Sequence, residues 1–225
     1  RLVQAATEQH PAPRFLLMSS LAAREPHLSP YAASKRQGEE VLAEGSGEMQ
    51  WSVLRPPPVY GPGDKELLPL FRWMGRGIAP VPGPSHARFS ILYIQDLAAA
   101  TVQWLACENT RKRVFELHDG QPNGYGWEDL IHTIARLTGR RVRRVAIPAP
   151  FLEWLAKLNT IAARLAGYTP MLTPGKVREL RHLNWVCDNT LLSRETGWTP
   201  RVRLEEGLRC TLKLAGPIQT ASQAE

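Results

Sequence analysis

The chain has 225 residues, 43% of them hydrophobic, which is enough to bury one sizeable core that can be divided between two lobes. It contains no apolar run long enough to span a bilayer, and its three widely spaced cysteines argue against a disulfide framework and a zinc site. We therefore expect a cytoplasmic globular protein with reduced cysteines and no bound metal.

The formal net charge of +7 raises the question of nucleic-acid binding. The basic residues are mostly scattered, and a group at 140–144 alternates with valine as on a half-exposed strand. No nucleic-acid-binding motif accompanies the charge. We interpret it as a solvated face and expect no nucleic-acid partner.

The first part of the chain predicts strands and helices that alternate as in a parallel sheet. Residues 14–20 form a continuous apolar run that ends in two serines, as in a buried parallel strand. Ser29 and Pro30 are a helix cap and a first-turn proline, which predict a helix over 31–44. Residues 51–55 predict the next strand, which ends at three consecutive prolines.

The segment after these prolines, PPPVYGPGD at 56–64, predicts an extended loop. It is a candidate site segment because ligands in open parallel sheets bind beyond the carboxyl ends of the strands. An amphipathic helix over 66–75, a strand over 89–94 and a helix from Asp96, its expected cap, to Cys107 follow. Residues 114–118 predict the last strand of the sheet.

The remaining residues predict a smaller lobe, with a helix over 127–137, a strand over 142–147 and a long helix over 151–166. Packing within the lobe is the expected role of the apolar stripe on the long helix. A hydrophobic substrate pocket and an interfacial membrane helix are the alternatives, and we expect no membrane contact. The stripe consists of Leu152, Leu155, Leu158, Ile161, Ala162 and Leu165. A last helix over 204–214 precedes a polar tail that we expect to be disordered.

Tyr31 and Lys35 lie four residues apart near the start of the first predicted helix, so they share one of its faces. A phenol ordinarily has a pKa near 10, and a lysine cation beside it favours the phenolate, which suits acid–base work. Ser20, at the end of the preceding strand, could hydrogen-bond a substrate oxygen while Tyr31 moves the proton. Proton transfer of this kind accompanies hydride transfer with a nicotinamide.

Four motifs, FLLMSS, PYAASK, WSVLRPPPVYGPGD and FSILYIQDLAAAT, together resemble the extended short-chain dehydrogenase/reductase family, which contains NAD-dependent epimerases and dehydratases. The resemblance implies that Ser20, Tyr31 and Lys35 are the catalytic residues and that Tyr31 and Lys35 also contact the cofactor, NAD or NADP. It implies further that Pro56 and Val59 line the nicotinamide. In members that act on nucleotide sugars, an arginine near the position of Arg88 contacts the substrate diphosphate; a surface salt bridge is its alternative role.

The resemblance extends to residues 169–200, where Asp188 is expected to begin a short helix and Gly197, Trp198 and Pro200 to form a structural turn. It departs from the family at two points. The Val-Tyr-Gly that often follows the serine pair is replaced by residues 21–24, and no glycine-rich phosphate-binding turn precedes Ser19. We therefore expect a C-terminal fragment of a longer enzyme that is inactive alone.

The expected fold is α/β: the C-terminal part of a doubly wound, Rossmann-like parallel sheet plus a smaller α/β substrate lobe. Residues 1–60 and 91–119 are assigned to the partial dinucleotide-binding domain, residues 61–90 and 120–216 to the substrate lobe, and residues 217–225 to the tail. The Tyr31 helix pairs subunits in many relatives, so a homodimer is one expected assembly.

Three functions remain open from the sequence. The first is an NAD(P)-dependent epimerase, dehydratase or reductase of a nucleotide sugar, favoured by the Tyr31/Lys35 helix and Arg88. The second is an NAD(P)-dependent oxidoreductase of a hydrophobic, sterol- or lipid-like alcohol or ketone, favoured by the missing Val-Tyr-Gly and the apolar helix at 151–166. The third is a non-catalytic binding or assembly subunit, which the intact Ser20, Tyr31 and Lys35 argue against.

Overall fold

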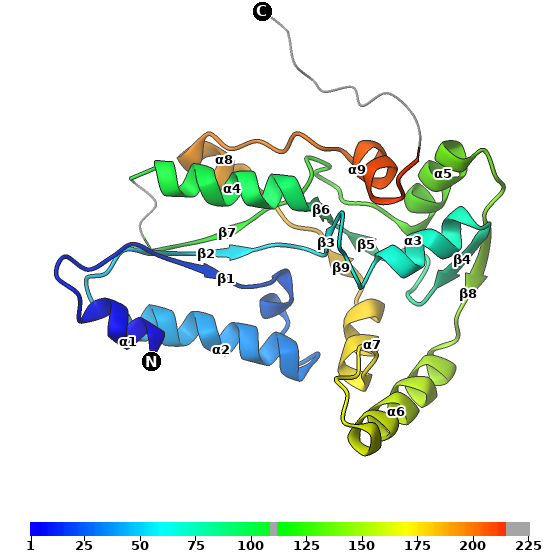
Figure 1. The fold of residues 1–225 in the computed structure, drawn as a ribbon, viewed down its shortest axis with the longest axis horizontal. Coiled ribbons are helices and arrows are strands. Elements are labelled where there is room, and N and C mark those ends of the chain that lie inside the picture. Colours follow the sequence, from blue (N-terminus) through cyan, green and yellow to red (C-terminus); the bar gives the residue numbers. More distant parts are fainter. Residues whose placement is uncertain (109–111, 215–225) are drawn as a thin grey trace, which may run out of the picture.

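The computed structural model describes residues 1–108 and 112–214 (Figure 1). The tail predicted at 217–225 lies outside the described residues. The helices are α1 Leu2–Thr7, η1 Leu21–Arg24 (a 3-10 turn), α2 Pro30–Gly45, α3 Leu68–Gly75, α4 Ile94–Ala106, α5 Trp127–Thr138, α6 Ala149–Ala166, α7 Pro174–Arg181, α8 Thr190–Thr196 and α9 Leu204–Thr211. The strands are β1 Phe15–Met18, β2 Trp51–Arg55, β3 Val59–Tyr60, β4 Ile78–Val81, β5 Arg88–Phe89, β6 Leu92–Tyr93, β7 Arg113–Glu116, β8 Arg143–Ala146 and β9 Asn184–Trp185.

A three-stranded parallel sheet in the order β1-β2-β7 forms the first part of the fold. The helix α2 covers one face of this sheet, and α4 and α8 cover the other (Figure 1). The register pairs Met18 with Leu54, and Arg55 with Glu116, so the carboxyl ends of all three strands meet at one edge. The predicted Rossmann-like arrangement of this half is confirmed.

Apolar side chains on both faces hold the sheet between its helices. On the α2 side, Leu42 packs against Val53, and both are fully buried. On the other side, Trp104 of α4 and Leu192 of α8 pack against a group that includes Phe115 of β7. The central strand β2 is therefore buried on both faces, as expected for a strand inside a parallel sheet.

A second and larger core lies beyond the carboxyl edge of the sheet. It joins α3, α5 and α9 around Phe71, Ile134 and Leu208, each of them fully buried. Helix α5 begins after Gly126 and ends at Gly139, whose φ of 66° is the left-handed conformation that glycine adopts at a helix end. The predicted helix and its glycine end are confirmed.

The strand predicted over 89–94 is instead two short strands with different partners. Residues 88–89 (β5) pair with β9, whereas residues 92–93 (β6) pair with β3. Between them, the Ser90 hydroxyl accepts a hydrogen bond from the backbone N–H of Cys187 at 3.2 Å. The chain changes neighbours at this serine, which sequence periodicity over six residues does not reveal.

The assignment of Asp96 as a helix cap is wrong. Helix α4 begins at Ile94, and the buried Asp96 carboxylate accepts hydrogen bonds from the backbone N–H groups of Arg201 and Val202 at 3.0 and 2.9 Å. Asp96 thus links the segment before α9 to α4. The bonded residues lie more than a hundred positions apart, so no local sequence pattern predicts this contact.

The expectation that the apolar stripe of the long helix packs within the lobe is also wrong for most of its members. Of that stripe, Leu152 is buried, but Leu155, Leu158, Ile161 and Leu165 are exposed. Helix α6 packs on α7 through Leu152, Ala156 and Val177, a cluster too small to cover the rest of the helix. Helix α7 and strand β9 have no counterpart among the predicted elements.

Candidate active site

Helix α2 begins where the serine and proline predict. The Ser29 hydroxyl accepts a hydrogen bond from the backbone N–H of Ala32 at 2.9 Å, and Pro30 occupies the first turn. Helix α2 therefore presents Tyr31 in its first turn, next to the loop that leaves η1.

Tyr31 and Lys35 share one face of α2, as the spacing predicts. The Lys35 ammonium lies 5.7 Å from the centroid of the Tyr31 ring and donates a hydrogen bond to the Met18 carbonyl at 3.2 Å. Half of the Tyr31 surface is exposed. The pair therefore stands at the carboxyl end of β1 with its phenol open to a ligand, the geometry required of an acid–base group.

The two serines after β1 have different environments. Ser19 is buried and donates a hydrogen bond to the Glu39 carboxylate at 2.5 Å. Ser20 is half-buried and begins η1, and its hydroxyl oxygen accepts a hydrogen bond from the backbone N–H of Ala22 at 3.2 Å. No group of the described residues accepts a hydrogen bond from the Ser20 hydroxyl, so Ser20 is the serine able to donate to a substrate oxygen.

A buried ion-pair network under α2 was not identified from the sequence. Arg55 donates two hydrogen bonds to Glu39, at 2.9 and 2.5 Å, and the bond to this carboxylate raises the pKa of Arg55. Arg55 also approaches Glu116 at 4.0 Å, and Glu116 pairs with Arg24 of η1 at 3.4 Å. Together with the Ser19 contact, this network joins the ends of the three sheet strands to η1 and α2.

The helical spacing contains a signal for this network. Tyr31, Lys35 and Glu39 follow one another at intervals of four, so the glutamate lies on the same face of α2 one turn beyond the lysine. A glutamate on the face that covers a sheet must be paired. Its partner comes from β2, which sequence spacing alone does not reveal.

Helix α7 is docked on the N-terminus of α2. The Ser29 hydroxyl, which caps α2, also donates a hydrogen bond to the buried Glu179 carboxylate of α7. At Gly175 a Cβ atom would lie only 2.7 Å from the Ser29 Cβ, so this approach requires glycine. The α6–α7 unit is therefore held directly against the start of the helix that carries Tyr31.

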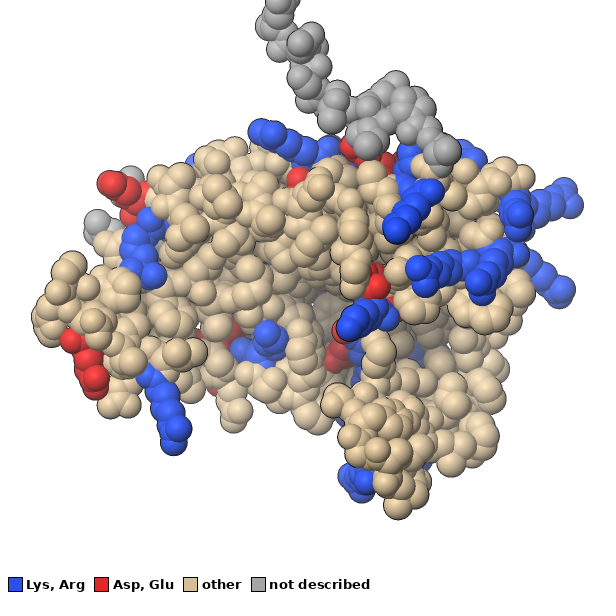
Figure 2. Space-filling view, viewed as in Figure 1, with Lys and Arg blue, Asp and Glu red and all other residues tan. Residues whose placement is uncertain are grey.

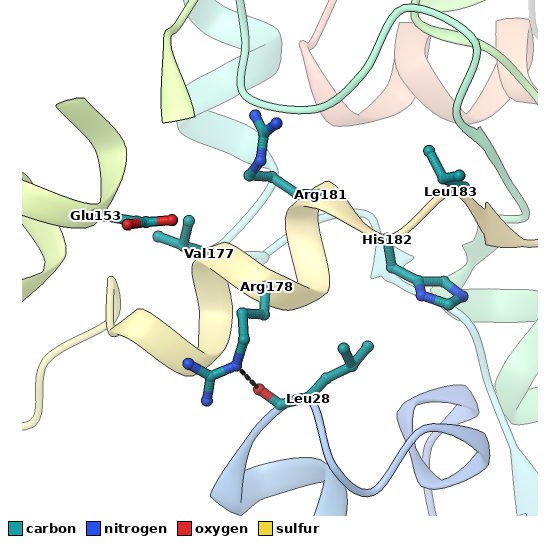
Figure 3. A pocket seen from close by; sticks show the side chains of 7 residues that line it. All are labelled: Leu28, Glu153, Val177, Arg178, Arg181, His182 and Leu183. Carbon is teal, nitrogen blue, oxygen red and sulfur yellow. Dashed lines mark hydrogen bonds between the residues drawn. The ribbon is translucent and has the colours of Figure 1, made fainter. Parts of the chain in front are cut away.

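An open groove of about 390 Å³ lies where this unit meets the loop before α2 (Figure 3). It is lined by Leu28, Glu153, Val177, Arg178, Arg181, His182 and Leu183. Figure 3 shows Arg178 reaching down to Leu28, whose carbonyl accepts a hydrogen bond from the guanidinium at 2.7 Å. None of Ser20, Tyr31 and Lys35 lines the groove, so it adjoins the candidate site without containing it.

The loop residue Pro56 lies beside the turn that follows β1, and Val59 lies in β3, paired with Leu92 of β6. The Pro56 carbonyl accepts a hydrogen bond from the backbone N–H of Leu21 at 2.9 Å, which fixes this loop beside η1. Pro56 is buried and Val59 is half-buried in β3. Their expected contact with a nicotinamide stays a prediction.

Arg88 lies in β5, in the second part of the fold. Its guanidinium donates to the backbone carbonyls of Asn123 and Gly124, at 3.1 and 2.8 Å, and to the Asp129 carboxylate at 3.2 Å. This is the salt bridge that the sequence left as the alternative role, although the side chain is 43% exposed. A diphosphate contact stays a prediction and would compete with these bonds.

The short helix expected near Asp188 begins two residues later. Asp188 accepts hydrogen bonds from the backbone N–H and the hydroxyl of Thr190, at 2.9 and 2.6 Å, and the hydroxyl bond lowers the pKa of Asp188. Gly197 ends α8 with a φ of 71°. The residue before the helix is Asn189 rather than Asp188, whereas the glycine that ends it is as predicted.

In the described part of the chain, no three His, Cys, Asp or Glu side chains are grouped to hold a metal ion. Cys187 is buried, which raises the pKa of its thiol to about 12. Within the same residues, no helix is both long and apolar enough to cross a membrane.

Two curated relatives are similar to most of the chain. It is 36% identical over 173 residues to the ceramide reductase of Caulobacter vibrioides, covering 76% of this chain and 53% of that protein. It is 30% identical over 206 residues to the decarboxylating sterol-4-alpha-carboxylate 3-dehydrogenase of Saccharomyces cerevisiae, covering 81% of this chain and 55% of that enzyme. The chain thus spans about half the length of these relatives.

The fold is also similar to that of solved structures. UDP-glucuronic acid 4-epimerase from Bacillus cereus, in complex with UDP-glucuronic acid and NAD, matches with a TM-score of 0.69 at 17% identity, over 94% of this chain and 64% of that one. The model of the NAD dependent epimerase/dehydratase family matches residues 1–117, which include the Ser20, Tyr31 and Lys35 site. The chain belongs to this family of NAD dependent epimerases and dehydratases.

Proposed function

We propose that this chain supplies the serine, tyrosine and lysine of an NAD(P)-dependent oxidoreductase that acts on a hydrophobic, sterol- or lipid-like alcohol or ketone. The observation that carries the proposal is the exposed Tyr31 phenol with the Lys35 ammonium on the same helix face, at the carboxyl end of a parallel strand. Ligands of such sheets bind at this edge.

Each residue has a role that its surroundings support. Tyr31 gives a proton to the carbonyl oxygen during reduction and takes it back from the alcohol during oxidation. Ser20 donates a hydrogen bond to the same oxygen and thereby holds it against Tyr31. Lys35 holds its ammonium on the same helix face as the phenol and is anchored there by the Met18 carbonyl.

The donors at the end of β1 fit the nicotinamide ribose of NAD or NADP, because the Lys35 ammonium and the Tyr31 hydroxyl offer hydrogen bonds to its hydroxyl groups. The cofactor, when bound, accepts or supplies a hydride. The 18 residues that precede Ser19 contain no glycine, so the pyrophosphate cradle has no counterpart there. We assign the cofactor side to residues 1–60 and 91–119 and the substrate side to residues 61–90 and 120–216.

The choice of a hydrophobic substrate rests on two observations. The two curated relatives are named for a ceramide and for a sterol carboxylate. In addition, the donors of Arg88 are directed to three groups of this chain, so recognition of a diphosphate would require breaking existing bonds. Both favour this substrate class over the nucleotide sugar that the family resemblance first implied.

A substrate panel with the complete gene product tests the proposal. We expect NAD(P)H-dependent reduction of long-chain or sterol ketones and no turnover of nucleotide sugars. Tyr31→Phe should lower kcat by about 10²- to 10⁴-fold, the usual contribution of a positioned acid or base, without changing the melting temperature. Full activity in Tyr31→Phe would refute the assignment of the proton donor, whereas turnover of nucleotide sugars alone would refute the substrate class.

A further inference from the structure

Helix α6 presents an uncovered apolar face. Its buried residues are Leu152, Ala156 and Ala163, of which Leu152 and Ala156 pack against Val177 of α7. Six large apolar side chains of the same helix are between 39% and 85% exposed: Phe151, Trp154, Leu155, Leu158, Ile161 and Leu165. Exposure of so many large apolar groups on one element marks an interaction surface rather than a core.

The spacing along α6 separates this face from the charged residues. At 3.6 residues per turn, the six side chains fall within an arc of about 120°, and Glu153, Lys157 and Arg164 gather on a separate edge. Tyr168 and Met171, in the connection to α7, are also exposed and extend the apolar surface. The helix is thus apolar on one exposed side, and the border of this side carries two cations, Lys157 and Arg164, against one carboxylate, Glu153.

The charge around α6 favours one kind of partner over another. Residues 149–183 contain five Lys and Arg but two Glu, and β8, the strand that leads into α6, carries Arg143 and Arg144. Figure 2 shows blue side chains projecting around α5 and β8, whereas the lobe formed by α6 is mostly uncharged. An apolar face bordered by positive charge is complementary to an anionic lipid surface. It is less suited to a second copy of this chain, whose net charge is also +7.

We propose that α6 lies in the surface of an anionic bilayer, with Trp154 and Phe151 inserted at the boundary between the lipid headgroups and the acyl chains. Lys157 and Arg164 extend from the border of the helix toward lipid phosphates. The charged residues along α6 fit a helix that lies on the membrane rather than one that crosses it.

Direct contacts connect this surface to the candidate active site by way of α7. Helix α6 packs on α7, and Gly175 and Glu179 of α7 contact Ser29, the cap of α2. A membrane under α6 would therefore lie beside the unit that holds the start of the Tyr31 helix. This inference does not rest on the proposed dehydrogenase activity, because bilayer binding can be measured without turnover.

The test is co-sedimentation of the chain with vesicles of phosphatidylcholine, with and without phosphatidylglycerol. We expect binding to the anionic vesicles and a roughly tenfold or greater loss of partitioning in Trp154→Glu/Leu158→Glu. The matched control is Val102→Glu/Leu105→Glu, which changes two exposed apolar residues of α4, 65% and 60% exposed, and should bind as the unchanged chain does.

A second measurement does not depend on the folding of the glutamate variants. Vesicles that carry brominated acyl chains should quench part of the tryptophan fluorescence of the chain, and Trp154→Phe should remove that part while retaining the binding. Absence of binding to anionic vesicles, equal loss in the α4 control, or quenching unchanged by Trp154→Phe would each overturn the proposal. Self-association that Trp154→Glu/Leu158→Glu abolishes, without vesicle binding, would assign the face to a second copy instead.

Discussion

Arg55 and Glu39 form a two-bond ion pair beneath the helix that carries Tyr31, with side chains only 12% and 7% exposed. The same carboxylate accepts the hydrogen bond of Ser19, the residue before the candidate catalytic serine. The pair therefore holds two parts of the site together, the serine turn after β1 and the middle of α2.

Glu39→Gln should destabilise the protein by about 3 kcal/mol, because it leaves the buried Arg55 with only its longer contact to the Glu116 carboxylate, at 4.0 Å. The free energy of unfolding from urea titration measures this loss. The control is Glu40→Gln on the same helix, which removes an exposed pair with Arg36 at 2.8 Å and should change stability by less than about 0.5 kcal/mol. Equal effects of the two variants would show that the buried pair has no special role.

Gly175→Ala should displace α7 from the start of α2, because the new methyl group would lie 2.7 Å from the Ser29 Cβ and 3.2 Å from its Cα. We expect a loss of about 1–3 kcal/mol in the free energy of unfolding. Gly38→Ala is the matched control, since this exposed glycine of α2 has no atom within 4 Å of the added methyl group. It should stabilise α2 by about 0.5–1 kcal/mol, so two destabilised variants would argue against a specific clash at Gly175.

The elements whose signals are local could be predicted from the sequence. Ser29 and Pro30 define the start of α2, Gly139 defines the end of α5, and the helical interval between Tyr31 and Lys35 places them on one face. What could not be predicted depends on residues distant in the chain. The partner of Glu39 comes from a neighbouring strand, and the hydrogen-bond donors to Asp96 lie more than a hundred residues away.

The apolar stripe of α6 shows a different limit of the sequence. Periodicity identified the helix and its apolar residues, but exposure depends on how much surface the neighbouring elements offer. Of the six residues of this stripe, only Leu152 is buried, against Val177 and its neighbours. The spacing of apolar residues tells which side of a helix is apolar, but it does not tell what covers that side.

Lys35→Met should weaken the binding of NAD(P)H to the complete gene product by roughly tenfold or more, because it removes a charged hydrogen-bond donor at the end of β1. Nicotinamide fluorescence measures the affinity. Arg36→Met, at the next position of α2, removes an exposed cation paired with Glu40 and should leave the affinity unchanged. Unchanged binding in Lys35→Met would contradict a contact between Lys35 and the cofactor.

His118 should make the stability of the protein depend on pH. Its ring is buried, and Nδ1 accepts a hydrogen bond from the backbone N–H of Gly120 at 2.9 Å, which requires the unprotonated nitrogen. Burial lowers the pKa of His118 below its usual value, so the unfolded chain binds this proton more readily than the folded protein. The free energy of unfolding should therefore fall as the pH drops below about 6.5, by up to about 1.4 kcal/mol per pH unit until the folded pKa is reached.

The variant His118→Asn separates this effect from the other titrating groups. Its side-chain oxygen can still accept from the Gly120 N–H, but it does not titrate. The titration of Asp119 changes the free energy of unfolding in the opposite direction. Burial raises the pKa of Asp119, so the folded protein binds that proton more readily than the unfolded chain does. We therefore compare the two proteins between about pH 7.5 and pH 5. Melting temperatures that fall less steeply in His118→Asn would confirm the role of the imidazole, and parallel curves would assign the pH dependence to other groups.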